Sequence, residues 1–160
     1  MSEAAAPALA YAFARRHGLV LLALGERARL GLREGSPPDG AGNFTGDRDR
    51  SPGGRSWSNA FNDYGDGHWG PAPVASFQPN AWGLHDLAGN VSEWVADCWH
   101  DSYRRAPRDA SAWVNPGCRM HVIRGGAWAS SPDQTRSAWR APAARDTTNA
   151  RIGFRVVREL

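Results

Sequence analysis

Apolar positions in this chain occur in short runs, and none keeps the 3.6-residue period of an amphipathic helix for long. Three segments instead show the alternation or β-branched character of short strands: Asn90 to Val95, His121 to Gly125 and Gly153 to Val157. One short helix is compatible with Pro7 to Arg16, and Gly18 would end it. The pattern therefore excludes an all-helical fold and predicts little regular structure.

Loop chemistry fills much of the remaining chain. Residues 33–55 are rich in Gly, Pro, Asp, Ser and Arg, and residues 62–71 are again rich in turn formers. The 18 Gly and 11 Pro are accompanied by 8 Trp, so many turns are paired with large aromatic anchors. With 160 residues, 41% hydrophobic and 22% charged, the chain is typical of a single globular domain with a loop-rich fold.

The charge pattern limits the possible chemistry. All 19 basic residues are Arg, which excludes a lysine Schiff base, a lysine general base and a P-loop lysine. Eight of them lie between Arg119 and Leu160, opposite only Asp133, Asp146 and Glu159, so the C-terminal third is basic. The net charge of +3 comes with no DNA-binding motif, and we expect no nucleic-acid partner.

No membrane or export segment is expected. The apolar run from Leu19 to Leu24 is too short to span a bilayer, and Glu3 lies where a signal peptide carries positive charge. We therefore expect a cytoplasmic protein. The two cysteines, Cys98 and Cys118, leave the redox compartment open, because they suit either a disulfide or two buried thiols.

Four motifs together resemble one known family. They are PNAWGLHDLAGNVSEW (Pro79 to Trp94), RGGAW (Arg124 to Trp128), RSAWR (Arg136 to Arg140) and IGFR (Ile152 to Arg155). In this order they resemble the formylglycine-generating enzyme family, also called the sulfatase-modifying factor domain. The resemblance implies an irregular, loop-rich α+β fold of the C-type-lectin-like type over residues 41–160. Residues 1–40 are interpreted as a divergent or truncated N-terminal segment.

The resemblance also implies where an oxidase site would lie. In aerobic members two cysteines five positions apart bind copper(I), a soft ion that thiolates suit. The corresponding positions here are Ser131 and Arg136, so we expect neither copper nor a catalytic residue of that kind. Cys98 and Cys118 lie where some members have a structural pair. A nucleophilic pair of Cys98 with His100 would lack a third orienting group.

Calcium is the metal that the resemblance implies, through oxygen ligands on two irregular loops. The first site would use the Asp86 side chain, the Gly89 and Val91 carbonyls and the Glu93 carboxylate. The second would use Asn43, the Phe44 carbonyl, Asp66 and the His68 carbonyl. The alternative is that Asp86 and Glu93 only accept hydrogen bonds from turns and arginine.

Aromatic and basic residues near the motifs supply the candidate ligand contacts. Most tryptophans are expected in the core: Trp82, Trp94, Trp99 and Trp128. Trp139 is either core or an exposed anchor of a binding site. Four arginines could present planar forks to carboxylates or phosphates, or could be solvated and paired with Asp133 and Asp146: Arg136, Arg140, Arg145 and Arg151.

The missing cysteines favour a binding module over an enzyme. We expect a non-catalytic or divergent family member that recognises a protein or small-molecule ligand through its C-terminal loops. The alternative is a formylglycine-generating oxidase acting on a sulfatase cysteine, or a related iron-dependent sulfur oxidase. Metal ligands would then have to come from His85, His100 or His121, whose spacing fits no metal motif.

A variable protein of a diversity-generating retroelement is a third possibility on the same scaffold. Residues 124–155 resemble the variable region of such proteins in length and spacing. Randomised adenines in Asn codons cannot produce Gln or Trp, however, and Gln134 and Trp139 occupy such positions. At these two positions the sequence argues against that origin.

Overall fold

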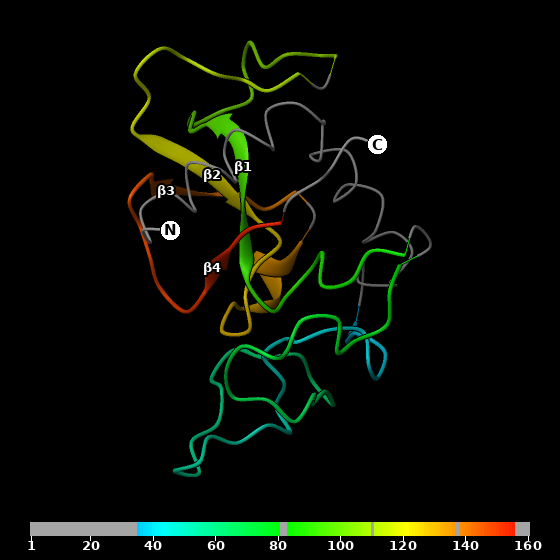
Figure 1. The fold of residues 1–160 in the computed structure, drawn as a ribbon. Helices are drawn as coiled ribbons and strands as arrows, with labels where there is room; N and C mark the ends of the chain where they lie inside the picture. Colours follow the sequence, from blue (N-terminus) through cyan, green and yellow to red (C-terminus); the bar gives the residue numbers. More distant parts are fainter. Residues whose placement is uncertain (1–34, 81–82, 110, 137, 156–160) are drawn as a thin grey trace.

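The computed structural model describes residues 35–80, 83–109, 111–136 and 138–155. Regular structure there consists of four strands and one 3-10 helix (Figure 1). In chain order these are β1 (Ser92–Cys98), β2 (Met120–Arg124), η1 (Pro132–Thr135), β3 (Ala141–Ala144) and β4 (Ile152–Gly153). The predicted helix at 7–16 lies outside the described residues. None of the described helices is long and apolar enough to cross a membrane.

The four strands form one sheet in the order β3-β2-β1-β4. The pairs β1–β2 and β2–β3 are antiparallel, while β4 lies parallel to β1. In the register of the central pair, Trp94 is opposite Ile123, and the pairing is irregular between Trp94 and Cys98. The motif segment that contains β1 therefore has a neighbouring strand on both sides.

Two of the three predicted strands are confirmed with shifted ends. The predicted strand at 121–125 is β2, one residue earlier, whereas the strand expected from Asn90 begins at Ser92. Asn90 lies in a turn with φ of +56°, a conformation that a strand cannot include. The third predicted strand, from Gly153, is present only as the end of β4: residues 154 and 155 are not in a strand, and 156–157 lie outside the described residues.

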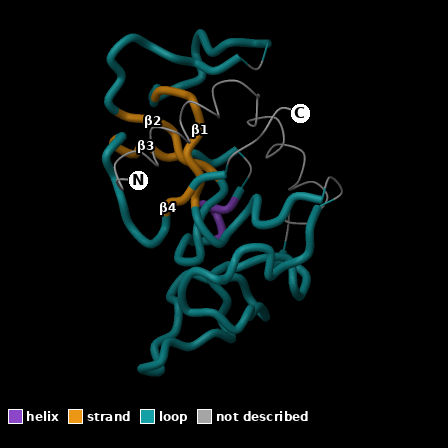
Figure 2. Tube along the Cα trace, viewed as in Figure 1, coloured by secondary structure: helices purple, strands orange, loops and turns teal. Residues whose placement is uncertain are grey.

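Residues 35–80 form a lobe without regular strands below the sheet (Figure 2). Its core is aromatic: Phe44, Phe61 and Tyr64 are buried, and Phe44 packs edge-on against both other rings at centroid distances of 5.7 and 6.0 Å. Such edge-to-face pairs contribute beyond the area that they bury. The lobe thus has its own small core in place of a hydrogen-bonded ladder.

The lobe is attached to the sheet through the turn before β1. The Asn90 N–H donates to the Asn43 carbonyl at 2.9 Å, and the Asn90 side chain bonds both the N–H and the carbonyl of Ala72. A second attachment runs from the Thr45 hydroxyl to the Ser130 carbonyl at 2.9 Å. These buried polar contacts replace the strand pairing that the lobe lacks.

The tryptophans lie around the core and not at its centre, contrary to expectation. Trp94, Trp99 and Trp128 are only half-buried, whereas the fully buried large side chains include Phe44 and Tyr64. Trp128 packs edge-on against Trp57, which stacks on Trp69 at 4.1 Å. Trp82 lies outside the described residues. An indole has an N–H that needs a partner, and Trp128 donates to the Ala150 carbonyl at 3.0 Å near the surface.

Candidate functional site in the C-terminal loops

The C-terminal loops place the predicted ligand-contact arginines at the surface. Arg136, Arg145 and Arg151 are exposed. The expected pairing with Asp133 and Asp146 carboxylates is not found between these described residues, and Arg136 donates instead to the Asp133 carbonyl at 2.8 Å. Their positive charge therefore faces water.

Arg140 differs from the other three because it is held by aromatic rings. Its guanidinium carbon lies 4.3 Å from the Trp99 ring centre and 4.4 Å from that of Tyr103, both within cation–π range. Arg124 donates a hydrogen bond to the Tyr103 hydroxyl at 3.0 Å, so the Tyr103 ring contacts Arg140 through its face and Arg124 through its hydroxyl. The sequence analysis did not connect Tyr103 to this site, since nothing local in the sequence indicates that residues after β1 meet those before β3.

Trp139, the other candidate anchor, is half-buried. Its backbone N–H donates to the Arg136 carbonyl at 2.8 Å, which closes the turn that carries both residues. The structure thus brings Trp139 and Arg136 into one turn and leaves part of the indole accessible.

The positions that the sequence analysis matched to the copper cysteines flank the helix η1. Ser131 is its N-cap residue, and the Ser131 hydroxyl lies 2.5 Å from an Asp133 carboxylate oxygen. Arg136 follows the helix as its C-cap. Ser131 thus lies at the start of the helix and Arg136 at its end, and neither side chain provides sulfur.

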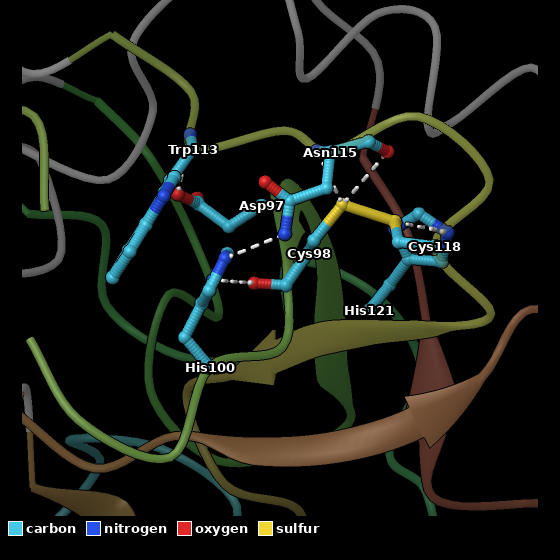
Figure 3. The surroundings of a disulfide bond; sticks show 7 residues. All are labelled: Asp97, Cys98, His100, Trp113, Asn115, Cys118 and His121. Carbon is cyan, nitrogen blue, oxygen red and sulfur yellow. Dashed lines mark hydrogen bonds between the residues drawn. A yellow bond between two sulfur atoms is a disulfide. The ribbon is translucent and has the colours of Figure 1, made fainter.

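The cysteines of the chain form one disulfide, Cys98–Cys118, at a distance from η1 in sequence (Figure 3). Both cysteines are thus accounted for by a structural bond. His121 lies beside it, with ring nitrogens 3.6 and 3.8 Å from the Cys118 sulfur. Burial lowers the pKa of His121, and the positive charge of Arg145 lowers it further.

In the first predicted calcium set, the Glu93 carboxylate is already bound by an arginine. Both Glu93 carboxylate oxygens accept hydrogen bonds from the Arg155 guanidinium, which also donates to the carbonyls of His85 and Asp86. One Asp86 carboxylate oxygen accepts from the Ala75 N–H at 2.8 Å, and the other is buried without a hydrogen-bond partner among the described residues. A calcium ion there would share Glu93 with Arg155, and the assignment of this set, with Gly89 and Val91, stays a prediction.

The second predicted set is brought together in the lobe. The Asp66 carboxylate accepts the Phe44 N–H at 2.7 Å and the His68 N–H at 2.8 Å, so these residues adjoin one another and Asn43. The Asn43 side-chain oxygen is buried without a hydrogen-bond partner among the described residues. Burial raises the pKa of Asp66, while the hydrogen bonds from the His68 and Phe44 N–H groups lower it. A hard cation with oxygen ligands would offset the burial of the Asp66 carboxylate, and the assignment of this set stays a prediction.

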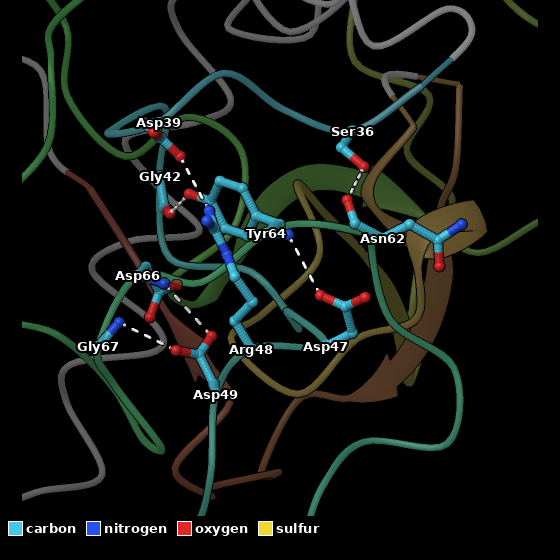
Figure 4. Close-up of polar contacts among 10 residues, drawn as sticks. All are labelled: Ser36, Asp39, Gly42, Asp47, Arg48, Asp49, Asn62, Tyr64, Asp66 and Gly67. Carbon is cyan, nitrogen blue, oxygen red and sulfur yellow. Dashed lines mark hydrogen bonds and ion pairs between the residues drawn. The ribbon is translucent and has the colours of Figure 1, made fainter.

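Other carboxylates of the lobe stabilise its backbone (Figure 4). Asp49 accepts the N–H groups of Asp66 and Gly67 at 3.3 and 3.0 Å, and Asp47 accepts that of Tyr64 at 3.3 Å. These bonds satisfy backbone donors that a strand would otherwise pair. The acidic residues of the lobe therefore have a structural role that the sequence pattern did not indicate.

The geometry defines a class of protein: an irregular, loop-rich α+β domain whose sequence motifs meet at a short mixed sheet. Comparison gives the family. The chain belongs to the sulfatase-modifying factor enzyme 1-like domain family, which matches residues 10–160. The predicted formylglycine-generating-enzyme resemblance and the C-type-lectin-like fold class are both confirmed. The match begins within the segment 1–40, and the domain boundary near residue 40 stays a prediction.

Three relatives illustrate the range of this family. The chain is 38% identical over 85 residues to "Serine/threonine-protein kinase pkn1" of Chlamydia caviae, covering 52% of this chain and 14% of the relative. It is 35% identical over 108 residues to the formylglycine-generating enzyme of Thermomonospora curvata, covering 62% and 36%. The structure of PvdO from Pseudomonas aeruginosa matches with a TM-score of 0.57 and 46% identity, covering 71% and 45%. The chain thus spans less than half the length of each.

Proposed function

We propose that this chain is a non-catalytic member of its family that binds an anionic ligand, a protein or a small molecule, through its C-terminal loops. The observation that carries the proposal is the residue type at the two positions matched to the copper cysteines: Ser131 and Arg136 provide no thiolate, whatever the redox state of Cys98 and Cys118. Copper(I) chemistry of the oxidase type requires soft ligands that these side chains do not provide.

The exposed arginines support the binding role. Arg136, Arg145 and Arg151 are exposed, and among the described residues none of them is paired with a carboxylate. Planar guanidinium forks suit carboxylate and phosphate groups. The kinase relative also supports a modular role, since its matching segment makes up only 14% of a protein named for another activity. We propose calcium as a structural ion, held first of all by the Asn43 and Asp66 set.

Turnover of a sulfatase-type peptide tests the non-catalytic part. The purified chain is loaded with copper(I) and given oxygen, a reductant and a peptide containing Cys-x-Pro-x-Arg, while an active family oxidase serves as the positive control. We expect the peptide mass to remain that of the thiol. Conversion to the aldehyde that a copper chelator abolishes would establish the alternative, a formylglycine-generating oxidase.

An array of acidic, phosphorylated and neutral peptides tests the binding part. We expect retention of anionic peptides, and Arg145→Gln with Arg151→Gln should weaken it by about tenfold or more per arginine, because a hydrogen bond to a charged group contributes about 1.5–3 kcal/mol. The matched control is Arg104→Gln with Arg108→Gln, which removes equal charge from exposed positions of another loop. Equal weakening by both pairs would show nonspecific attraction and contradict a site in the C-terminal loops.

A further inference from the structure

A long excursion leaves the sheet at the end of β1 and returns at the start of β2. Cys98 is the last residue of β1, Cys118 precedes β2 by two residues, and His121 is in β2. Most described residues between the cysteines are exposed, so the excursion is closed at its neck by these three side chains (Figure 3). One ligand atom from each of the three lies within 4.8 Å of the others.

We propose that this neck is a redox-gated zinc site: a disulfide when oxidised, and a Cys98, Cys118 and His121 site for Zn²⁺ when reduced. Two thiolates and one imidazole are a donor set that zinc accepts, with a fourth position left for water. The neck is then closed in either state, by a covalent bond or by a metal ion.

The surroundings of the trio support metal binding. The Asn115 N–H donates to the Cys98 sulfur at 3.1 Å, a contact that favours a thiolate there. The His121 ring also bonds the backbone carbonyl of Asp97. Metal-ligating histidines typically have such an outer partner, which fixes the ring orientation.

An ion can enter the neck after reduction only if the two cysteines move slightly apart. The Cα atoms of the cysteines are 6.0 Å apart. With zinc–sulfur bonds of about 2.3 Å in tetrahedral geometry, the sulfurs must separate to roughly 3.8 Å. Cys98 is only 1% exposed, but Cys118 is half-buried and its neighbours Gly117 and Arg119 are exposed. The chain on the Cys118 side can therefore move outward without disturbing the core.

The conversion balances with an external thiol or phosphine as the reductant. Two electrons and two protons convert the sulfur–sulfur bond into two thiols, while a dithiol reductant becomes a disulfide, or a phosphine takes an oxygen from water. Zinc then displaces the two thiol protons and forms two zinc–sulfur bonds. In a reducing compartment, such as the cytoplasm expected from the sequence, the reduced form would predominate.

Metal titration of the oxidised and reduced protein tests the proposal. The chain is reduced with a water-soluble phosphine, freed of it without oxygen, and titrated with Zn²⁺ against a chromophoric chelator, or with Co²⁺ while thiolate-to-metal absorption is recorded. We expect one equivalent bound by the reduced protein and none by the oxidised one. His121→Ala and Cys118→Ser should each weaken binding at least tenfold.

His100→Ala is the matched control, because His100 is close in sequence but engaged elsewhere. It stacks on Trp113 at 3.5 Å, and its ring nitrogens contact the Asn115 side chain and the Cys98 carbonyl. This variant should retain zinc. Undiminished affinity in His121→Ala would overturn the proposal, as would equal zinc binding by the reduced and oxidised proteins.

Two further measurements keep the test decisive where a variant fails to fold. X-ray absorption on the zinc-loaded wild type should show two sulfurs at about 2.3 Å and nitrogen or oxygen at about 2.0 Å. A first shell without sulfur would overturn the proposal. If reduction alone unfolds the chain, recovery of a cooperative melt on adding zinc supports it, and failure to recover contradicts it.

Discussion

Arg155 and Glu93, 62 residues apart in the chain, form a two-pronged ion pair beside the start of β1. The Nε atom of Arg155 lies 2.9 and 2.7 Å from the two carboxylate oxygens, and an Nη2 atom lies 2.5 Å from one of them. The same guanidinium donates to the carbonyls of His85 and Asp86. These contacts join the last sequence motif (Ile152 to Arg155) to the first (Pro79 to Trp94).

Breaking this pair should destabilise the protein independently of calcium. Removing one partner of a buried pair typically costs 3–5 kcal/mol. Because the two side chains are 23% and 19% exposed, we expect Glu93→Gln to lower the free energy of unfolding by about 2–4 kcal/mol. Urea unfolding of the wild type and the variant, with calcium and with chelator, measures this loss. Arg151→Lys, at an exposed position, is the control and should change the free energy of unfolding little. A loss seen only with calcium would instead assign Glu93 to the first calcium site.

Gly89→Ala should disrupt the attachment of the lobe. Gly89 has φ of +78°, and a Cβ there would lie 2.3 Å from the Asn43 carbonyl oxygen and 2.7 Å from the Phe44 ring. Gly54 has φ of +77° with nothing within 4 Å, so Gly54→Ala isolates the backbone cost of about 1–2 kcal/mol. At Gly89, steric overlap of the new Cβ with Asn43 and Phe44 should destabilise the fold by about a further 1–3 kcal/mol. Similar melting temperatures for the two variants would contradict the close approach.

Tyr64→Phe should change how stability depends on alkaline pH. Tyr64 is fully buried, its hydroxyl donates to the Gly42 carbonyl, and burial raises the pKa of the phenol. A raised folded pKa gives stability that is complete below the unfolded pKa of about 10 and is lost as pH rises above it, since only the unfolded state ionises. The variant should lose about 1–2 kcal/mol at neutral pH from the missing hydrogen bond. Urea unfolding from pH 8 to about 11 should show that the difference in free energy of unfolding between the wild type and the variant becomes smaller. A difference that stays constant over this range would contradict a buried, neutral phenol.

Calcium should stabilise the wild type through the lobe. Ligand binding to the folded state at 100 times its dissociation constant raises the free energy of unfolding by about 2.7 kcal/mol. Asp66→Asn removes a charged ligand and should abolish most of this increment, whereas Asp63→Asn, at an exposed position of the same lobe, should leave it intact. Melting curves with calcium and with chelator measure the increment. The absence of any increment in the wild type would contradict the second calcium site.

The sheet could be predicted only where the sequence has strand character. Residues of β2, such as Val122 and Ile123, are β-branched and buried, and the prediction there is confirmed. The strand β3 has the sequence APAA, without β-branched or aromatic residues and with a proline. Because β3 is an edge strand, Pro142 removes no bond from the interior of the sheet. Tertiary position, and not local propensity, makes this segment a strand.

The candidate sites show the same limit. Motif spacing predicts Ser131 and Arg136 as the counterparts of the copper cysteines, because the residues of a motif keep their spacing along the chain. Nothing local in the sequence pairs Arg140 with Tyr103 or places Arg155 against Glu93, since each contact depends on how distant segments cross at the sheet. The aromatic core of Phe44, Phe61 and Tyr64 was also missed, as its members lie in turn-rich segments without periodicity.

The attachment of the lobe depends on contacts between distant parts of the chain, which bears on the order of folding. The bond between Thr45 and Ser130 joins residues 85 positions apart, and the Asn43–Asn90 contact needs the turn before β1 to be formed. The entropy of closing such long loops is lost before the contacts that compensate it are made. We therefore expect the antiparallel strands β1 and β2 to form first and the lobe to dock after the rate-limiting barrier. Mutations in the lobe will mainly accelerate unfolding and leave the refolding rate nearly constant.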